Sequence, residues 1–404
     1  DVLPTGRNFY SVDVRAVPTA AAWELGRRAA DALALRYFQD EGNWPRTVAM
    51  SAWGTSNMRT GGDDIAQVLA LMGARPVWER GTGRVTGVTV IPLAELGRPR
   101  IDVTLKISGM FRDAFPVQVD LIDTAVRMIA ALDEDDDANP LAAAVRAART
   151  ALLAKGLDEA LAVRLAGARV FGAMPGAYGA GLQALIDTGA WEARSDLAEA
   201  FLAWGAFAYG SGSQGATARD AYRRLLATVD AVAHNQDNRE HDILDSDDYY
   251  QFQGGLAATV ATLRGAAPRV YHGDNAKAER PVVRSLQEEI GRVVRGRAGN
   301  PKWIAGVMRH GYKGAFEIAA TVDYLFAYAA TTDAVGDHHF DALYDAYIAD
   351  PSVRAFIADN NPAALREIAG RFREAIDRGL WAPRLNSAYD GLSALIAERK
   401  DAAE

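Results

Sequence analysis

Short apolar runs alternate with helical segments through the first third of this 404-residue chain. The run RTVAMSAWG (46–54) ends in a glycine turn and is typical of a buried strand, whereas PRIDVTLKISG (99–109) alternates apolar with polar residues. Between them, GGDDIAQVLALMG (61–73) carries apolar residues at helical spacing and begins with two carboxylates, which the helix dipole favours there. Strand patterns at RPVWER (75–80) and RVTGVTVIPL (84–93) flank a glycine turn at 81–83, and FRDAFPVQVDLIDTAVRMIAAL (111–132) predicts a helix interrupted near Pro116. Because strands that alternate with helices usually pair in parallel, we expect a mostly parallel α/β layer at the start of the chain.

Two short segments follow the predicted strands, and ligands bind beyond the carboxyl ends of the strands in such sheets. These segments are WGTSNMRTGG (53–62) and SGMFRD (108–113). The guanidinium of Arg59, in the first segment, is suited to bind a carboxylate or amide of a substrate. A structural ion pair with Asp63 is an equally good interpretation of the same residue.

Strand signals fade after the acidic stretch DEDDDANP (133–140), and most later segments carry helical periodicity with glycine or polar stops. The helical segments include SDLAEAFLAWGAFAYG (195–210), RDAYRRLLATVDAVAHNQ (219–236) and PVVRSLQEEIGRVVRGR (281–297). The predicted fold class is therefore α/β followed by mainly α. We expect a Rossmann-like α/β domain at residues 1–135 and a mainly α-helical domain at residues 136–404.

Composition excludes several classes of function. The formal net charge of −8 argues against nucleic acid or an anionic membrane as a partner, and no apolar run is long enough to span a bilayer. The chain has no cysteine, so a bound metal would need His, carboxylate or carbonyl ligands. The opening DVLPTGRNFYSVD lacks an initiating Met and resembles no signal peptide, so we expect a fragment of a longer protein.

Two nucleotide-binding motifs can be excluded. GSGSQG (210–215) has the letters of G-x-G-x-x-G, but it follows a helix-like stretch and lacks the strand–turn–helix context that gives the motif its meaning. No G-x-x-x-x-G-K-[ST] is present, so the chain has no P-loop of its own.

The densest cluster of chemically active residues is HDILDSDDYYQFQGG (241–255). An EF-hand counted from Asp245 would need glycine and glutamate where Tyr250 and Leu256 stand, which excludes that calcium loop. Carboxylates this close together raise one another's pKa or recruit a cation. Asp and Ser favour turns over helix interiors, so we expect a loop before the next helix. In a purely structural interpretation, Asp247 or Asp248 is the N-cap of that helix and the other carboxylates are solvated.

A second loop, YHGDNAKAERP (271–281), carries His272 and Asp274. In its structural interpretation, Asp274 or Asn275 caps a helix that runs through VVRSLQEEI (282–290). The two loops would lie at opposite ends of one helix and need not form one site.

Five blocks of the sequence carry a resemblance that covers nearly the whole chain. They are TGRNFYSVD, WGTSNMRTGGDDIAQVLALMGARPVW, LGRPRIDVTLKISGMFRDAFP, NPKWIAGVMRHGYKGA and HDILDSDDYYQFQGG. In this order they resemble the C-terminal third of the large subunit of aerobic cobaltochelatase, CobN, and more loosely that of magnesium chelatase. WGTSNMRTGGDDIAQ and VYHGDNAKAERP favour the cobalt branch. Tyr249, Tyr250, Gln251 and Phe252 depart from the magnesium-branch pattern.

The resemblance implies a function for the chain. The family's large subunit binds corrinoid and metal, and inserts Co²⁺ into hydrogenobyrinic acid a,c-diamide during aerobic cobalamin biosynthesis in the cytoplasm. AAA+ partner subunits bind and hydrolyse ATP with Mg²⁺, which agrees with the missing P-loop. Other catalytic acids belong to parts of the subunit outside this chain, so this fragment alone should not chelate.

Carboxylate and imidazole groups can hold Co²⁺ and accept the protons that leave a macrocycle. The expected catalytic residues are His241, Asp245 and Asp248, and the expected metal ligands are His241, Asp242, Asp245 and Asp247. The expected substrate-binding residues are Arg59, Tyr249, His272 and Asp274.

Three alternatives stay open: the porphyrin-binding subunit of magnesium chelatase, a non-catalytic scaffold that docks the AAA+ motor, and a free-standing α/β transferase. No nucleotide-binding loop supports the last of these.

Overall fold

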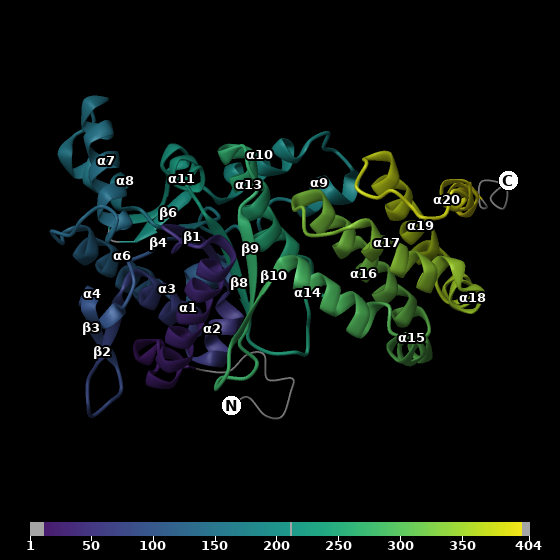
Figure 1. The fold of residues 1–404 in the computed structure, drawn as a ribbon, viewed down its shortest axis with the longest axis horizontal. Helices are drawn as coiled ribbons and strands as arrows, with labels where there is room; N and C mark the ends of the chain where they lie inside the picture. The colour runs from purple at the N-terminus through teal and green to yellow at the C-terminus, as the bar shows by residue number, and fades with distance from the viewer. Residues whose placement is uncertain (1–11, 211, 398–404) are drawn as a thin grey trace. The chain divides into compact units, whose positions relative to one another are not determined.

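The computed structural model describes residues 12–210 and 212–397 (Figure 1). Most of the block TGRNFYSVD lies outside the described residues. The chain forms two compact units, one of Asp1–Arg239 with Gln251–Ser285 and one of Glu240–Tyr250 with Leu286–Glu404. Within the described ranges, no helix is both long and apolar enough to cross a membrane.

An eight-stranded sheet forms the centre of the first unit, as counted over the described residues. Its strands, in spatial order, are β10 (Val282–Ser285), β9 (Arg269–Asp274), β8 (Ala231–Gln236), β1 (Thr47–Ala52), β4 (Asp102–Ile107), β5 (Val170–Gly172), β6 (Phe207–Gly210) and β7 (Ser213–Thr217). The five strands from β9 to β5 are parallel, and β10, β6 and β7 are antiparallel additions at the two edges. This mostly parallel sheet confirms the predicted α/β class. The hairpin β2 (Ala74–Trp78) and β3 (Val85–Val90), expected around the turn at 81–83, forms a separate pair.

Helices cover both faces of the large sheet (Figure 1). The helices of the first unit are α1 (Ala20–Glu41), α2 (Gly54–Thr60), α3 (Asp63–Met72), α4 (Leu93–Leu96), α5 (Gly109–Ala114), α6 (Pro116–Ala130), α7 (Pro140–Ala154), α8 (Glu159–Gly167), α9 (Gln183–Thr188), α10 (Arg194–Gly205), α11 (Arg219–Leu226) and α13 (Gly255–Arg264). Helices α1, α3 and α6 pack on one face, and α10 packs on the other with α11 and α13 beside it. A parallel sheet needs cover on both faces because its strands are apolar on both sides.

Helix α3 is the centre of the core on its face of the sheet. All ten of its residues are buried, and its C-terminus ends at Gly73 with φ +86°, as the glycine in the sequence predicted. A Cβ on Gly26 of α1 would lie 2.5 Å from the Cβ of Ala66, so only glycine lets the two helices approach this closely. This packing holds the first turn of α3 at the carboxyl end of β1.

Three segments expected to be helical do contain the helices α10, α11 and α14 (Leu286–Val293), but one end of each is a strand instead. Residues 207–210 form β6, residues 231–236 form β8 and residues 282–285 form β10, so the three assignments were wrong at these residues. The alanine-rich runs in the first two segments fit helical periodicity as well as a strand, and pairing inside the sheet decided between them. GSGSQG thus follows strand β6, but it leads into the antiparallel strand β7, so the strand–turn–helix context is still missing.

Six strands after residue 136 belong to the same sheet, again within the described residues, so the compact units do not divide at the expected boundary of 135/136. The second unit is helical, as expected for the later part of the chain. Its elements are α12 (Asp247–Tyr249), α14 (Leu286–Val293), η3 (Val294–Ala298), α15 (Pro301–Val307), η4 (Met308–His310), α16 (Tyr312–Thr331), α17 (Asp337–Tyr344), η5 (Asp345–Ala349), α18 (Pro351–Asn360), α19 (Pro362–Asp377) and α20 (Ala388–Ala397). The π-helical turn η2 (Tyr250–Gly254) joins α12 to α13.

Candidate functional site

The topology of the sheet marks one edge of the first unit as a candidate site. Strand β1 lies between β4 and β8 in the sheet. Helix α3 lies on the connection from β1 to β4, and helix α13 on the connection from β8 to β9. These two helices pack on opposite faces of the sheet. Such a switch point opens a crevice at the carboxyl ends of the strands, where α/β proteins bind ligands. The segments that begin at Trp53 and at Asp237 lie there.

The segment after β1 is fixed by close backbone contacts. A Cβ on Gly54 would lie 2.8 Å from backbone atoms of both Met110 and Phe111, so only glycine fits where α2 meets the start of α5. Gly61 and Gly62 then adopt φ of +74° and +99°, which turn the chain directly from α2 into α3. This turn places Asp63 and Asp64 beside the end of β8.

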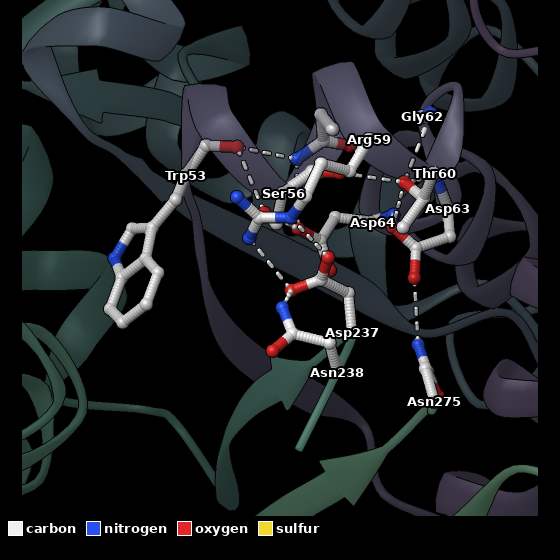
Figure 2. Close-up of polar contacts among 11 residues, drawn as sticks. Trp53, Ser56, Arg59, Thr60, Gly62, Asp63, Asp64, Asp237, Asn238 and Asn275 are labelled. Carbon is white, nitrogen blue, oxygen red and sulfur yellow. Dashed lines mark hydrogen bonds and ion pairs between the residues drawn. The ribbon is translucent and has the colours of Figure 1, made fainter. Parts of the chain in front are cut away.

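We call the polar side chains gathered there the strand-end cluster. Its members are Asn57, Arg59, Asp63, Asp64, Asn235, Asp237 and Asn275. They come from α2, α3 and the ends of β8 and β9, and most of them are drawn in Figure 2.

Asp63 and Asp64 of the cluster are almost completely buried. Asp64 accepts hydrogen bonds from Nδ2 of Asn57 at 2.8 Å and from Nδ2 of Asn235 at 2.7 Å. Asp63 accepts from the hydroxyl of Thr60 at 2.6 Å and from Nδ2 of Asn275 at 2.9 Å (Figure 2). Burial raises the pKa of both carboxyls, and the charge of Asp63 raises that of Asp64 further. The environment of the pair therefore favours the protonated form more than solvent would.

Arg59 pairs with Asp237 and not with Asp63, so the ion pair named in the structural interpretation was wrong. The guanidinium donates from Nε at 2.7 Å and from a terminal nitrogen at 2.9 Å to the two carboxylate oxygens, a bidentate geometry (Figure 2). The pair is mostly buried, with side-chain exposures of 18% for Arg59 and 10% for Asp237. Substrate binding by Arg59 stays a prediction, and in this arrangement it would require the ion pair to open.

Four ionisable or hydroxyl side chains form a second feature, the buried polar row, across four neighbouring strands. Lys106 on β4 pairs in register with Ser51 on β1, Ser51 with His234 on β8, and His234 with His272 on β9. All four are buried. Side chains that are paired in register on neighbouring strands point to the same face of a sheet. Here that face is the one covered by α10, because Lys106 contacts Phe201 of α10. The row therefore brings basic groups together close to the carboxyl ends of the strands.

The central histidine of the row is held in the neutral form. Nδ1 of His234 lies 2.7 Å from the hydroxyl of Ser51, and its ring lies 4.4 Å from that of Trp53. Burial, with a smaller contribution from His272, lowers the pKa of His234 to about 3. His234 is therefore an uncharged hydrogen-bonding group at neutral pH.

Lys106 is the most unusual member of the row. Its ammonium group is fully buried, has no hydrogen-bond partner among the described residues, and lies 5.2 Å from the ring centre of Phe201 on α10. A Cβ on Gly205 would lie 2.3 Å from Nζ, so the glycine at the end of α10 makes room for the amine. Burial lowers the pKa of Lys106 to about 7.

His272 and Asp274, predicted to bind substrate, both lie on β9 and are buried. Nε2 of His272 lies 3.0 Å from the side-chain oxygen of Gln236. Burial alone would raise the pKa of Asp274, but Arg239 at 2.7 Å and Arg284 at 3.2 Å together hold it below its usual value. The expected cap at Asp274 or Asn275 was wrong, because the chain continues into strand β10 and the next helix begins at Leu286.

The Asp-rich loop of residues 241–248 belongs to the second unit. Residues 241–246 form a loop as predicted, with the side chains of Ile243 and Leu244 fully buried, and Asp247 begins α12. Within it, the side chain of Asp242 accepts from the amide of Leu244 and that of Asp245 accepts from the amide of Asp242. Ser246, and not either of the two aspartates that follow it, caps α12. The expected N-cap was therefore wrong by one residue.

Arg297 of η3 neutralises part of the loop. It donates to both oxygens of Asp242, at 2.6 and 2.9 Å, and lies 3.0 Å from a carboxylate oxygen of Asp245. Burial and the charge of Asp242 raise the pKa of Asp245, although Arg297 opposes the rise. Burial of the carboxyl and the charge of Asp247 raise the pKa of Asp248 to about 6, even though the residue as a whole stays exposed to solvent, which limits this rise.

The described residues contain no group of three or more His, Asp or Glu side chains arranged to hold a metal ion. His241 is exposed, Tyr249 is buried, and Asp242 and Asp245 both bind Arg297. Metal binding and catalysis by the loop therefore stay predictions. As it stands, the loop offers one carboxyl, that of Asp248, whose pKa is raised to about 6.

The sequence interpretation missed most of the strand-end cluster and the buried polar row. Asp63 and Asp64 were interpreted as favourable charges in a helix, Asp63 also as a partner of Arg59, and His234 lay in a segment expected to be helical. One signal was available, because polar residues gather at the ends of two segments that pair as neighbouring strands. These residues are Asn235, Asp237, Asp274 and Asn275. Without β8 assigned as a strand, that signal could not be used.

Comparison with known proteins adds to this geometry. The chain matches the family described as CobN/Magnesium Chelatase over residues 1–388. It is 63% identical, over 98% of its length, to the aerobic cobaltochelatase subunit CobN of a Sinorhizobium species, and covers 31% of that protein. It is 35% identical to a magnesium-chelatase subunit of Cereibacter sphaeroides, over 95% of the chain and 31% of the relative.

A solved structure agrees with the sequence comparisons. The catalytic subunit of cobaltochelatase from Mycobacterium tuberculosis superposes with a TM-score of 0.93 at 50% identity, over 98% of this chain and 33% of that one. The chain thus spans about a third of the length of these relatives. The two relatives described as cobaltochelatase subunits are 63% and 50% identical to the chain, and the magnesium-chelatase subunit is 35% identical.

Proposed function

The chain belongs to the CobN/magnesium chelatase family, and we propose that it is the C-terminal part of a cobaltochelatase large subunit. The observation that carries the proposal is the match to the catalytic subunit from Mycobacterium tuberculosis, with a TM-score of 0.93 at 50% identity. The reaction would be ATP-dependent insertion of Co²⁺ into hydrogenobyrinic acid a,c-diamide during cobalamin biosynthesis in the cytoplasm. Co²⁺ is then a substrate, and AAA+ partner subunits bind ATP and Mg²⁺.

Within this reaction, we propose that the Asp-rich loop exchanges protons and metal. Metal insertion displaces protons from the macrocycle nitrogens, and a carboxylate with a pKa near the working pH is a suitable acceptor. The pKa of Asp248, raised to about 6, supports that role. His241, Asp242, Asp245 and Asp247 would supply oxygen and nitrogen ligands, which suit Co²⁺, once Arg297 releases the two carboxylates that it binds.

The predicted substrate-binding residues divide between the two units. Arg59, His272 and Asp274 are held by neighbours in the first unit, and Tyr249 is buried in the second. We propose that the three residues of the first unit position the strand ends, because their polar groups are already engaged. Direct contact with substrate would require each of them to leave a present partner.

A binding experiment tests the proposal. Isothermal titration of the chain with Co²⁺ and with hydrogenobyrinic acid a,c-diamide should show binding of both. Asp245→Asn with Asp247→Asn should weaken Co²⁺ binding about tenfold, because two of the proposed charged oxygen ligands are lost. A matched double variant of exposed aspartates of the same unit, Asp359→Asn with Asp390→Asn, should bind as the wild type does. Equal Co²⁺ affinity in all three proteins would refute the role of the loop.

A second function, a scaffold that docks the AAA+ motor, is favoured by one observation. Arg297 already neutralises two loop carboxylates, as in a structural rather than a metal-binding loop. Under this function the loop variants would lose motor-stimulated chelation in the full-length subunit without any change in Co²⁺ or corrinoid affinity. The titration together with an activity assay therefore separates the two functions.

A further inference from the structure

A hollow opens on the surface of the second unit where α15 meets the start of α16, far along the chain from the Asp-rich loop. Its volume is about 580 Å³, within the range of small-molecule sites. It is lined by Trp303, Gly306, Val307, Arg309, His310, Lys313 and Glu317. None of these residues belongs to the predicted site.

The shape of the hollow is fixed by two glycines in the sequence MRHGYKG. Gly311 joins η4 to α16 with φ +55°, a conformation that favours glycine. A Cβ on Gly314 would lie 2.1 Å from the carbonyl oxygen of Val307, so the end of α15 and the start of α16 touch through their backbones. The side chains around this contact are therefore held on a rigid corner.

The hollow is electropositive. Arg309 and His310 are exposed, and neither makes an ion pair with any described residue. Lys313 lies 3.9 Å from Glu317, a weak contact between exposed groups. The amino end of the 20-residue helix α16 has no side-chain cap from the described residues, so its first amide groups add positive potential at the same place. An anion is the complementary ligand.

Aromatic surface adjoins these cations. Trp303 is half-buried in the wall, and its ring is fixed by the guanidinium of Arg297, 4.9 Å from the ring centre. Tyr312 and Phe316, which precede the lining residues Lys313 and Glu317 in the sequence of α16, are 66% and 55% exposed, and at i, i+4 they share one face of the helix. Exposed aromatic side chains next to exposed cations fit a flat apolar body that carries acidic groups.

From this combination we infer that the hollow binds the carboxylate groups of a flat, largely apolar ligand. The inference rests on the proposed function, under which a tetrapyrrole with carboxylate side chains is the ligand. Free phosphate would use the cations but not the aromatic surface. An acidic peptide of a partner protein would not need a cavity of this size. Arg297 binds the Asp-rich loop and Trp303 at once, so the hollow and the loop share one anchoring residue.

The test measures binding of hydrogenobyrinic acid a,c-diamide to the chain by quenching of tryptophan fluorescence. Arg309→Gln and Lys313→Gln should each weaken binding about threefold to tenfold, and the double variant by more than tenfold, because each removes one charge facing the ligand. The matched controls are Arg280→Gln and Lys302→Gln, exposed side chains that do not line the hollow. The controls should change the affinity less than about twofold. Affinity should also fall as salt is added.

Three further probes decide the ligand chemistry. The same macrocycle with every carboxylate converted to an amide should bind at least tenfold more weakly, and inorganic phosphate and a synthetic acidic peptide should not compete at equal concentration. Equal affinity of the double variant and the wild type would overturn the inference, as would equal binding of the amidated macrocycle. Competition by phosphate or by the peptide would reassign the hollow to that ligand and also overturn it.

Failure of the inference and failure of the proposed function give different results. If only the inference is wrong, the wild-type chain binds the corrinoid and the hollow variants bind it equally well. If the proposed function is wrong, the wild-type chain does not bind the corrinoid, and the full-length subunit with its partners does not insert Co²⁺. In the full-length enzyme the inference further predicts a raised KM for corrinoid, with kcat nearly unchanged, in the Lys313→Gln variant.

Discussion

Replacing Lys106 by methionine should stabilise the protein at neutral and acidic pH. The ammonium group of Lys106 is fully buried without a hydrogen-bond partner among the described residues, and burial lowers its pKa from 10.5 to about 7. A charged amine in this position therefore costs folding free energy. Methionine has a similar length and no charge, so it should occupy the same space beside Phe201 and Gly205.

The magnitude follows from the pKa difference between the folded and unfolded chain. A fall from 10.5 to about 7 spans about 3.5 pH units, and at about 1.4 kcal/mol per unit this corresponds to about 5 kcal/mol. Between pH 7 and 10.5 the unfolded chain binds more protons at Lys106 than the folded chain does. Wild-type stability from this group is therefore fully present above pH 10.5 and is lost as the pH falls to 7. Relaxation around the amine reduces the effect, so we expect a gain of about 2–5 kcal/mol for Lys106→Met at pH 6.5.

The assay is urea unfolding of wild type and Lys106→Met at pH 6.5, 8 and 9.5, followed by far-UV circular dichroism. The advantage of the variant should shrink at each step towards alkaline pH. Lys302→Met, at an exposed position, should show no such trend. A variant less stable than wild type at pH 6.5, or a difference that does not change with pH, would refute the reasoning. Under the proposed function, stabilisation accompanied by loss of chelation in the full-length subunit would show that the buried amine is retained for function.

Other substitutions test the packing and the ion pairs. Arg59→Met should cost about 3 kcal/mol in urea unfolding because it leaves the mostly buried carboxylate of Asp237 unpaired; a loss below 0.5 kcal/mol would contradict the buried pair. Gly54→Ala should cost about 1–3 kcal/mol by overpacking, whereas Gly81→Ala, with open space around its Cβ, should leave the melting temperature unchanged. Arg297→Met should cost about 2–4 kcal/mol at pH 7 because it leaves the two loop carboxylates that it binds without a cation; a loss below 0.5 kcal/mol would argue against these ion pairs.

Much of the fold could be predicted from the sequence because periodicity is a local property. The strand at 47–52, the helix at 63–72 and the hairpin around residues 81–83 were all correctly predicted from spacing and glycine stops. The helix interrupted at Pro116 was also confirmed, as α5 and α6. These elements have strong patterns that tertiary packing had no reason to override.

Less of the candidate site could be predicted, because its residues meet only through the sheet. Asp64 and Asn235 are 171 residues apart in the chain, yet Nδ2 of Asn235 lies 2.7 Å from Oδ1 of Asp64 in the structure. Their contact depends on β8 pairing beside β1, and the alanine-rich sequence of β8 fits a helix equally well. The Asp-rich loop was visible in the sequence, but its partner Arg297 was not, since no local pattern links η3 to the loop.

The sequence by itself determined the mostly parallel α/β class of the first unit, the helical character of the second unit and the family, because these rest on local periodicity and on ordered blocks of residues. Only the tertiary structure decided which charges are paired. In the structure Arg59 forms an ion pair with Asp237, and Arg297 forms one with Asp242. Lys106 has no hydrogen-bond partner in the part of the chain that the structure describes. The physical reason is that pairing and burial depend on which strands become neighbours. That neighbourhood is set by packing across the whole sheet, not by any short stretch of the chain.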